Sequence, residues 1–249
     1  MNAMIFAAGL GTRLKPITDT LPKALLPLNG KTLLEYQIQG LRQAGFTHIV
    51  VNVHHLAGQI VDYLRANRNF GAQVLISDES DMLLDTGGGL LKAFPLFRAG
   101  EPILACNVDI LSNISIPAFL SSAKASDLAT LVVSDRPTKR YLLFDEQGQM
   151  RGWTNIATNE YRPSLPHAAF QDCRKLAFSG MQLLSPDIIT PLREVQKEKG
   201  DKFSLIDLYV SICQDKSIRA YIPDNYKMMD VGKIDQLTEA QTFAQALDI

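Results

Sequence analysis

The stretch of sequence best suited to chemistry lies near the N-terminus, where residues 7–14 read Ala-Ala-Gly-Leu-Gly-Thr-Arg-Leu. Glycines that follow a strand let backbone N–H groups approach phosphate oxygens closely. Arg13 and, further on, Lys23 add the positive charge that a triphosphate, with about four negative charges, requires. Either cation taken alone would be read as a solvated surface side chain. Together with the glycines they predict a phosphate-binding loop.

This loop differs from the glycine loop of nicotinamide-dependent enzymes. The dinucleotide fingerprint needs a third glycine where this chain has Leu14, and it needs a helix that begins at once. Pro16 and the run from Thr18 to Lys23 indicate a long irregular loop instead. The sequence therefore argues against a dinucleotide-binding enzyme.

Asp109 and Asp230 are the candidate metal ligands. Asp109 follows a predicted strand, in Asn107-Val108-Asp109, and Asp230 follows the apolar residues 226–229. Mg²⁺ prefers oxygen ligands, keeps several waters and typically takes one or two carboxylates together with substrate phosphates. A single Asp at a strand end is more often a turn former or a helix cap. Two that converge on one ion would form a magnesium site.

A third unusual segment is Asp85-Thr86-Gly87-Gly88-Gly89. Glycine in a helix costs about 1 kcal/mol relative to alanine. Three in a row at a helix start therefore indicate either a flexible loop or a close approach of the backbone to something flat.

The elements that must position these residues alternate between strands and helices in the first half. Such alternation predicts βαβ units and a Rossmann-like, mostly parallel α/β sheet flanked by helices, with ligands at the carboxyl ends of the strands. The second half begins with a β-hairpin (141–144 and 150–153), followed by a polar loop or lid at 155–173. The expected strands are 3–8, 49–53, 73–76, 102–106, 128–133 and 175–184, and the expected helices are 32–44, 56–67, 88–97, 204–214 and 233–247.

Composition restricts the partners. The chain has 249 residues, 46% of them hydrophobic, and a net charge of −1, so we expect a packed core and no nucleic-acid partner. The three cysteines are odd in number and widely spaced, which is typical of buried thiols in a reducing compartment. We see neither the basic start of a signal peptide nor an apolar run near the roughly 18 residues that span a membrane. These features predict a cytoplasmic protein without a membrane partner.

Residues 9–16 and 22–27 together resemble the opening motif of the sugar-1-phosphate nucleotidyltransferases, or sugar-nucleotide pyrophosphorylases. That family has G-x-G-T-R-(L/M)-x-P followed by P-K-x-(L/M)-x-P, and the resemblance extends over nearly the whole chain. It implies one domain, 1–249, with a nucleotide-binding half (1–135) and a sugar-binding, metal-completing half (136–249). It also implies Mg²⁺ on Asp109 and Asp230, although Val108 stands where most relatives have glycine.

The same resemblance assigns the remaining site residues. Arg13, Lys23 and Asp109 are the implied catalytic residues. The implied nucleotide-binding residues are Ala7, Ala8, Gly9, Leu10, Gly11, Thr12, Arg13, Lys23, Asp85, Thr86, Gly87, Gly88 and Asn107, and the implied sugar-binding residues are Trp153, Asn155, Ser179 and Gly180. Many relatives carry a Glu-Lys pair after the hairpin, but this chain has no such Lys. Lys175, Arg174 or a residue of the lid is left to bind the sugar phosphate.

The resemblance implies transfer of a nucleotidyl group from a nucleoside triphosphate, with UTP favoured, to a sugar 1-phosphate, with N-acetylmuramate 1-phosphate favoured. One alternative is a guanylyltransferase that uses GTP and a mannose- or heptose-type sugar 1-phosphate. Another is an inactive regulatory subunit that binds nucleotide sugars, but such a subunit would typically have lost Arg13, Lys23 or one Asp. The oligomeric state is not predicted.

Overall fold

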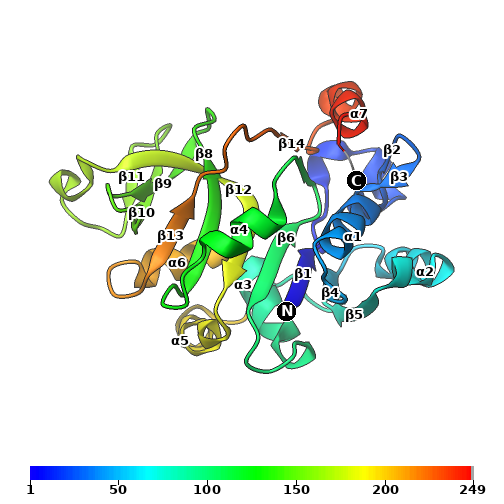
Figure 1. Cartoon of the computed structure of the whole chain (residues 1–249), viewed down its shortest axis with the longest axis horizontal. Coiled ribbons are helices and arrows are strands. Elements are labelled where there is room, and N and C mark those ends of the chain that lie inside the picture. The colour runs from blue at the N-terminus through cyan, green and yellow to red at the C-terminus, as the bar shows by residue number, and fades with distance from the viewer. Residues whose placement is uncertain (248–249) are drawn as a thin grey trace.

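A mixed ten-stranded sheet forms the centre of the protein in a computed structural model that describes residues 1–247 (Figure 1). Four neighbouring strands are parallel, in the order β6-β1-β4-β5. Their bounds are Asn2–Phe6 (β1), His48–Val53 (β4), Gln73–Asp78 (β5) and Ile103–Asn107 (β6). The predicted Rossmann-like arrangement of the first half is confirmed.

The second half of the chain extends the same sheet. Strand β12 (Arg174–Leu184) runs antiparallel to β6, with Met181 opposite Cys106, and it also pairs with β8 (Ala129–Ser134) and β9 (Arg140–Phe144). Beyond β9 lie β10 (Met150–Asn155) and β11 (Glu160–Arg162), while β13 (Ile218–Tyr221) pairs with β8. The sheet is therefore continuous between the two halves.

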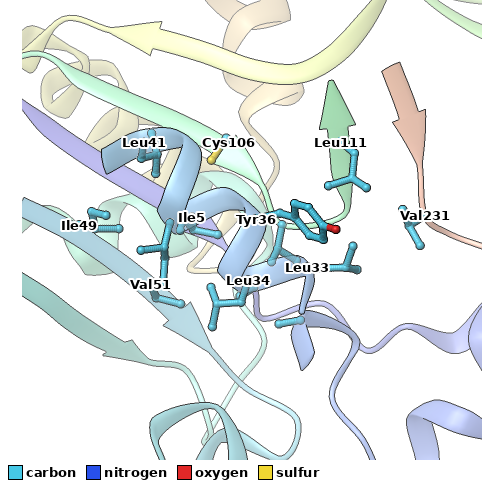
Figure 2. Close-up of a cluster of buried hydrophobic side chains, with 14 of the residues drawn as sticks. Ile5, Leu33, Leu34, Tyr36, Leu41, Ile49, Val51, Cys106, Leu111 and Val231 are labelled. Carbon is cyan, nitrogen blue, oxygen red and sulfur yellow. The ribbon is translucent and has the colours of Figure 1, made fainter. Parts of the chain in front are cut away.

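Helices cover both faces of the sheet, so β1 is buried on both sides. Ala3 and Ile5 pack into one apolar cluster, with α1 (Leu33–Gln43), α2 (Ala57–Ala66), α4 (Ile116–Ser122) and α7 (Leu237–Gln245). Met4 and Phe6 pack into the other, with α3 (Asp85–Ala93), α5 (Ile189–Lys199) and α6 (Leu205–Ile212). Figure 2 shows the apolar face of α1 directed at Ile5, Ile49 and Cys106.

Two small sheets and several 3-10 turns complete the described residues. The small sheets are β2 (Pro27–Leu28) with β3 (Lys31–Thr32), and β7 (Ile110–Ser112) with β14 (Met228–Asp230). The 3-10 turns are Thr12–Leu14, Ile17–Asp19, Lys23–Leu25, Arg68–Gly71, Phe94–Leu96, His167–Phe170, Pro186–Ile188 and Ile234–Gln236.

The predicted loop at 155–173 is in part a strand. Residues Glu160–Arg162 form β11 and add a third strand to the hairpin. The Thr154 hydroxyl donates to the Glu160 carbonyl (2.9 Å), and the rings of Tyr161 and Phe170 stack with centroids 5.6 Å apart. The polar composition of the segment concealed this short pairing. Within residues 1–247, no helix has the length and apolar character needed to cross a membrane.

Candidate active site

A pocket of about 480 Å³ opens at the carboxyl ends of the parallel strands. Most of the expected nucleotide-binding residues lie on its wall, but Leu10, which is exposed, and the buried Gly87 and Gly88 do not. The wall consists of Phe6, Ala7, Ala8, Gly9, Gly11, Thr12, Arg13, Lys23, Asn52, Glu79, Leu83, Asp85, Thr86, Asn107, Val108, Asp109, Lys202 and Gly232.

The glycine loop on this wall is a tight turn folded against Lys23. Gly11 has φ +62°, and a Cβ there would lie 2.8 Å from Thr18 Cγ2 and 3.2 Å from Lys23 Cβ. The Gly11 carbonyl accepts from the Leu14 N–H (2.8 Å) and from the Thr18 hydroxyl (2.9 Å). Only glycine combines this backbone angle with so little space, so position 11 requires glycine for this turn.

A buried polar network that the sequence analysis missed supports the start of this loop. The Ala7 N–H donates to Asn52 Oδ1 (2.7 Å), and Asn52 Nδ2 donates to Glu79 Oε1 (2.7 Å). The second oxygen of Glu79 accepts from the Leu84 N–H (3.0 Å). Burial raises the pKa of Glu79, and these two hydrogen bonds partly oppose the shift. The signal that could have revealed the network is a polar Asn inside the apolar strand at 49–53.

Lys23 and Asp109 form an ion pair on the pocket wall between Lys23 Nζ and Asp109 Oδ2. The Lys23 side chain is 10% exposed and that of Asp109 is 23% exposed. Val108, the departure from the family pattern, is buried in the apolar cluster against α1, and its N–H donates to the Phe6 carbonyl (3.1 Å). A bulky residue at position 108 is therefore accommodated without displacing Asp109 from the pocket.

Asp230 is brought beside Asp109 by the ribbon of β7 and β14. In this ribbon Asp230 is opposite Ile110, and the Val231 N–H donates to the Asp109 carbonyl (2.9 Å). Burial, and then the charge of Asp109, raises the pKa of Asp230, although the residue as a whole is exposed and does not line the pocket. The negative charge of Asp109 therefore acts on Asp230, and the charges of Lys23, Arg13 and Arg136 oppose this effect only in part.

Gly232 leaves room for Arg13 to approach Asp230. A Cβ at position 232 would lie 2.8 Å from Arg13 Nη2 and 2.9 Å from Asp230 Oδ1. Arg13 is exposed and lines the pocket, so its guanidinium can turn toward a ligand. The structure thus brings together Arg13, Lys23, Asp109 and Asp230, from three separate parts of the sequence.

The donor set is consistent with Mg²⁺, which remains a prediction. Within residues 1–247, no cluster of three or more His, Cys, Asp or Glu is arranged to hold an ion. Mg²⁺ does not need one, because phosphate oxygens and waters supply most of its ligands. The charge of Asp109 contributes to the raised pKa of Asp230, as expected where two carboxylates lie close together.

The glycine run at 87–89 has a different physical reason from the expected one. The N–H groups of Gly87 and Gly88 both donate to the Phe203 carbonyl (2.9 and 3.2 Å). A Cβ at Gly88 would lie 2.0 Å from the Asp201 carbonyl oxygen, and one at Gly89 would lie 2.6 Å from Glu79 Oε1. The close partner of these glycines is the chain itself. In this segment only Asp85 and Thr86 reach the pocket wall.

Comparison with known proteins assigns the family. Residues 2–246 match the family model described as nucleotidyl transferase. The chain belongs to the nucleotidyl transferase family. It is 42% identical over 125 residues, 50% of this chain and 54% of the relative, to an N-acetylmuramate alpha-1-phosphate uridylyltransferase of Neisseria meningitidis serogroup B. It is 27% identical over 257 residues, 96% of this chain and 62% of the relative, to a UTP–glucose-1-phosphate uridylyltransferase of Synechocystis.

These matches span little more than half the length of the two curated relatives. Among solved structures, a putative glucose-1-phosphate thymidylyltransferase from Bacillus anthracis superposes with a TM-score of 0.82, covering 100% of this chain and 97% of that one at 17% identity. This likeness confirms the nucleotidyl transferase fold.

None of the expected sugar-binding residues of this nucleotidyl transferase lies on the pocket wall. Ser179 is fully buried, with its hydroxyl 3.3 Å from that of Ser134. Gly180 has φ +76°, and a Cβ there would lie 2.7 Å from Ile110 Cγ1 and 3.3 Å from Asn107 Nδ2. The bend at Gly180 therefore contacts both flanks of Asp109.

Trp153 and Asn155 lie on β10, in the hairpin sheet. The Arg162 guanidinium stacks over the Trp153 ring at 4.8 Å, and Asn155 Oδ1 accepts from the Ala157 N–H (3.1 Å). Both side chains thus have partners within their own sheet. Their assignment to the sugar remains a prediction.

Proposed function

We propose that this protein transfers a nucleotidyl group from a nucleoside triphosphate to a sugar 1-phosphate and releases pyrophosphate, with Mg²⁺ as cofactor. The observation that carries the proposal is the gathering of Arg13, Lys23, Asp109 and Asp230 around the glycine loop. Two cations, a loop with backbone N–H donors and two carboxylates are the groups that nucleotidyl transfer needs.

The acceptor needs no general base, because a phosphate monoester is already largely dianionic near neutral pH, with a second pKa of about 6. One of its oxygens attacks the α-phosphorus in line, the new O–P bond forms, and the bond to the β-phosphate oxygen breaks as pyrophosphate leaves. No covalent intermediate with the protein is required. Catalysis then consists of positioning two anions and neutralising their charge.

The residues divide this work between them. Backbone N–H groups of residues 8–13 bind the triphosphate, and Arg13, which is exposed and lines the pocket, neutralises its charge. Lys23, held beside Asp109, supplies a fixed charge at the α- or β-phosphate. When bound on Asp109 and Asp230, Mg²⁺ would stabilise negative charge on the phosphates.

For the substrates, we propose UTP and N-acetylmuramate 1-phosphate. The support is the 42% identity to the Neisseria uridylyltransferase that bears this name, over half of the chain. The second relative also carries a uridylyl activity in its name, with glucose 1-phosphate as the sugar. UTP is therefore supported by both relatives and the acceptor by one.

The test is pyrophosphate release from a matrix of nucleoside triphosphates (UTP, GTP, CTP, dTTP and ATP) against sugar 1-phosphates, with Mg²⁺ and with EDTA. The sugars are the 1-phosphates of N-acetylmuramate, N-acetylglucosamine, glucose and mannose. We expect the UTP row to dominate and EDTA to abolish release. Dominance of GDP-sugars would overturn the substrate assignment and leave the reaction class intact.

Two controls complete the experiment. Asp109→Asn should abolish release, which excludes a contaminating transferase as the source of activity, and Asp224→Asn, at an exposed position, should not. If no pair of substrates releases pyrophosphate while UDP-sugars still bind by calorimetry, the protein is a regulatory subunit and the proposed function is wrong.

A further inference from the structure

The cation that binds the acceptor phosphate is the part of the site that the sequence leaves open. Arg162 is unsuitable, because its guanidinium is bound by Glu160 (2.7 Å) and Asp207 (3.4 Å) and stacks over Trp153. Lys175 and Arg174 are exposed and lie five and six residues from Gly180 along β12, which is roughly 16–20 Å. None of the three cations is placed beside Asp109.

The sheet brings a different arginine to the active edge. β12 is antiparallel to both β6 and β8, so β6 and β8 are parallel to each other and end at the same edge. Asp109 is two residues beyond the end of β6, and Arg136 is two residues beyond the end of β8. Only β12 separates them, at its bend around Gly180.

A direct contact fixes the direction of the Arg136 side chain. Its Nη2 donates to the Phe178 carbonyl (3.0 Å), two residues before Gly180. Because the bend at Gly180 contacts Asn107 and Ile110, the guanidinium is held against the segment that borders Asp109.

Arg136 also retains unused binding capacity. Its Nε is buried without a hydrogen-bond partner, and no carboxylate in the described part of the chain forms an ion pair with it. The neighbouring Asp135 pairs with Arg174 instead (3.6 Å). A half-buried guanidinium without an ion-pair partner can bind an anion through its outer N–H groups.

We propose that Arg136 binds the phosphate of the acceptor sugar 1-phosphate and holds it for attack. The inference rests on the proposed function. It assigns separate cations to the two substrates: Arg13 and Lys23 to the triphosphate, and Arg136 to the acceptor. The planar guanidinium suits a phosphate because two of its N–H groups can donate in parallel to two oxygens.

The experiment compares Arg136→Gln and Arg136→Lys with Arg174→Gln, a matched loss of an arginine that faces solvent beside Asp135. The best substrate pair from the pyrophosphate-release matrix is used. Because a charge-assisted contact is lost, we expect Arg136→Gln to lower kcat/KM for the sugar 1-phosphate by about 10- to 100-fold. The KM for the triphosphate should stay unchanged. Arg136→Lys should recover part of the loss, and Arg174→Gln should resemble the wild type.

Inorganic phosphate provides a readout that a structural role of Arg136 would not move. In the wild type it should inhibit competitively against the sugar 1-phosphate, and in Arg136→Gln this inhibition should weaken together with acceptor binding. If Arg136→Gln instead lowers the Tm and raises both KM values alike, the arginine maintains the bend of β12 and the proposal is wrong.

The outcomes separate this inference from the proposed function. Wild-type protein that releases no pyrophosphate from any pair overturns both. Active wild type with an Arg136→Gln variant of unchanged acceptor KM and unchanged phosphate inhibition overturns only the role of Arg136.

Discussion

Gly88→Ala is the substitution for which the structure makes its sharpest prediction. The added Cβ would lie 2.0 Å from the carbonyl oxygen of Asp201 and 3.0 Å from Leu84 Cβ. A backbone carbonyl cannot rotate away as a side chain can. The segment that carries it is also fixed, because the Phe203 N–H donates to the Leu84 carbonyl (3.2 Å) and the Phe203 carbonyl accepts from Gly87 and Gly88.

The expected loss in the free energy of unfolding follows from the segments that the added Cβ would displace. An ordinary contact requires the 201–203 segment or α3 to shift by more than about 1 Å, and overpacking of this kind costs about 1–3 kcal/mol. Loss of two of the three hydrogen bonds adds about 1–3 kcal/mol. The better helix propensity of alanine offsets about 1 kcal/mol of this destabilisation. We expect a net destabilisation near 3 kcal/mol, which lowers the Tm of a chain of this size by roughly 6–12 °C.

The assay is thermal unfolding without ligands, with Gly58→Ala as the matched helical control. A Cβ at Gly58, in the first turn of α2, meets nothing within 4 Å, so this variant should be as stable as the wild type or slightly more stable. Gly88→Ala should also lose activity, because Thr86 and Lys202, on the two displaced segments, line the pocket. A Gly88→Ala variant that keeps the wild-type Tm but loses triphosphate binding would refute the packing argument and support the implied nucleotide-binding role of Gly87 and Gly88.

Three further predictions concern the polar groups of the site. Lys23→Ala should lower turnover by about 100-fold or more and raise the triphosphate KM. Lys124→Ala, at an exposed position, should do neither. Equal losses of turnover in the two variants would mean that the overall charge of the protein matters, and not a specific contact of Lys23. Glu79→Gln places an N–H donor where an oxygen accepts, so urea unfolding should reveal a loss of about 1–3 kcal/mol, and unchanged stability would contradict a supporting role. Asp230→Asn should lower turnover by about 100-fold across a Mg²⁺ titration. Because burial and Asp109 raise the pKa of Asp230, its ionised form destabilises the fold. In EDTA the Asn variant should therefore equal or exceed wild-type stability at pH 7, and the difference should vanish below the ordinary pKa of 3.8.

The parts of the fold that the sequence predicts well are those that a local pattern specifies. Buried parallel strands are continuous apolar runs, as in β1 and β4, and they stand out from amphipathic helices such as α1. The glycine loop is likewise local, because the φ of Gly11 and the nearby Lys23 lie within one short segment. Asp109 and Asp230 could be paired only through the family resemblance, since their contact depends on a ribbon that joins distant segments.

The features that the sequence hides depend on tertiary contacts. The 201–203 segment that packs on Gly87 and Gly88 is more than 110 residues away, so no local pattern identifies it. Arg136 reads as one charged residue of a loop. Its position becomes meaningful only when β12 inserts between β6 and β8 and brings their carboxyl ends to one edge.

The two aspartates of the site differ in their ion pairs. Lys23 forms an ion pair with Asp109, whereas no ion pair of Asp230 is found among residues 1–247. Burial, and then the charge of Asp109, raises the pKa of Asp230, and the charges of Lys23, Arg13 and Arg136 lower it only in part. The four groups Arg13, Lys23, Asp109 and Asp230 alone are formally neutral, and a triphosphate with a sugar phosphate would bring about six negative charges. Fixed arginines and lysines cannot match that number without destabilising the empty site by mutual repulsion. A divalent cation that arrives with the triphosphate avoids this repulsion, which is the physical reason to expect an unpaired carboxylate at position 230.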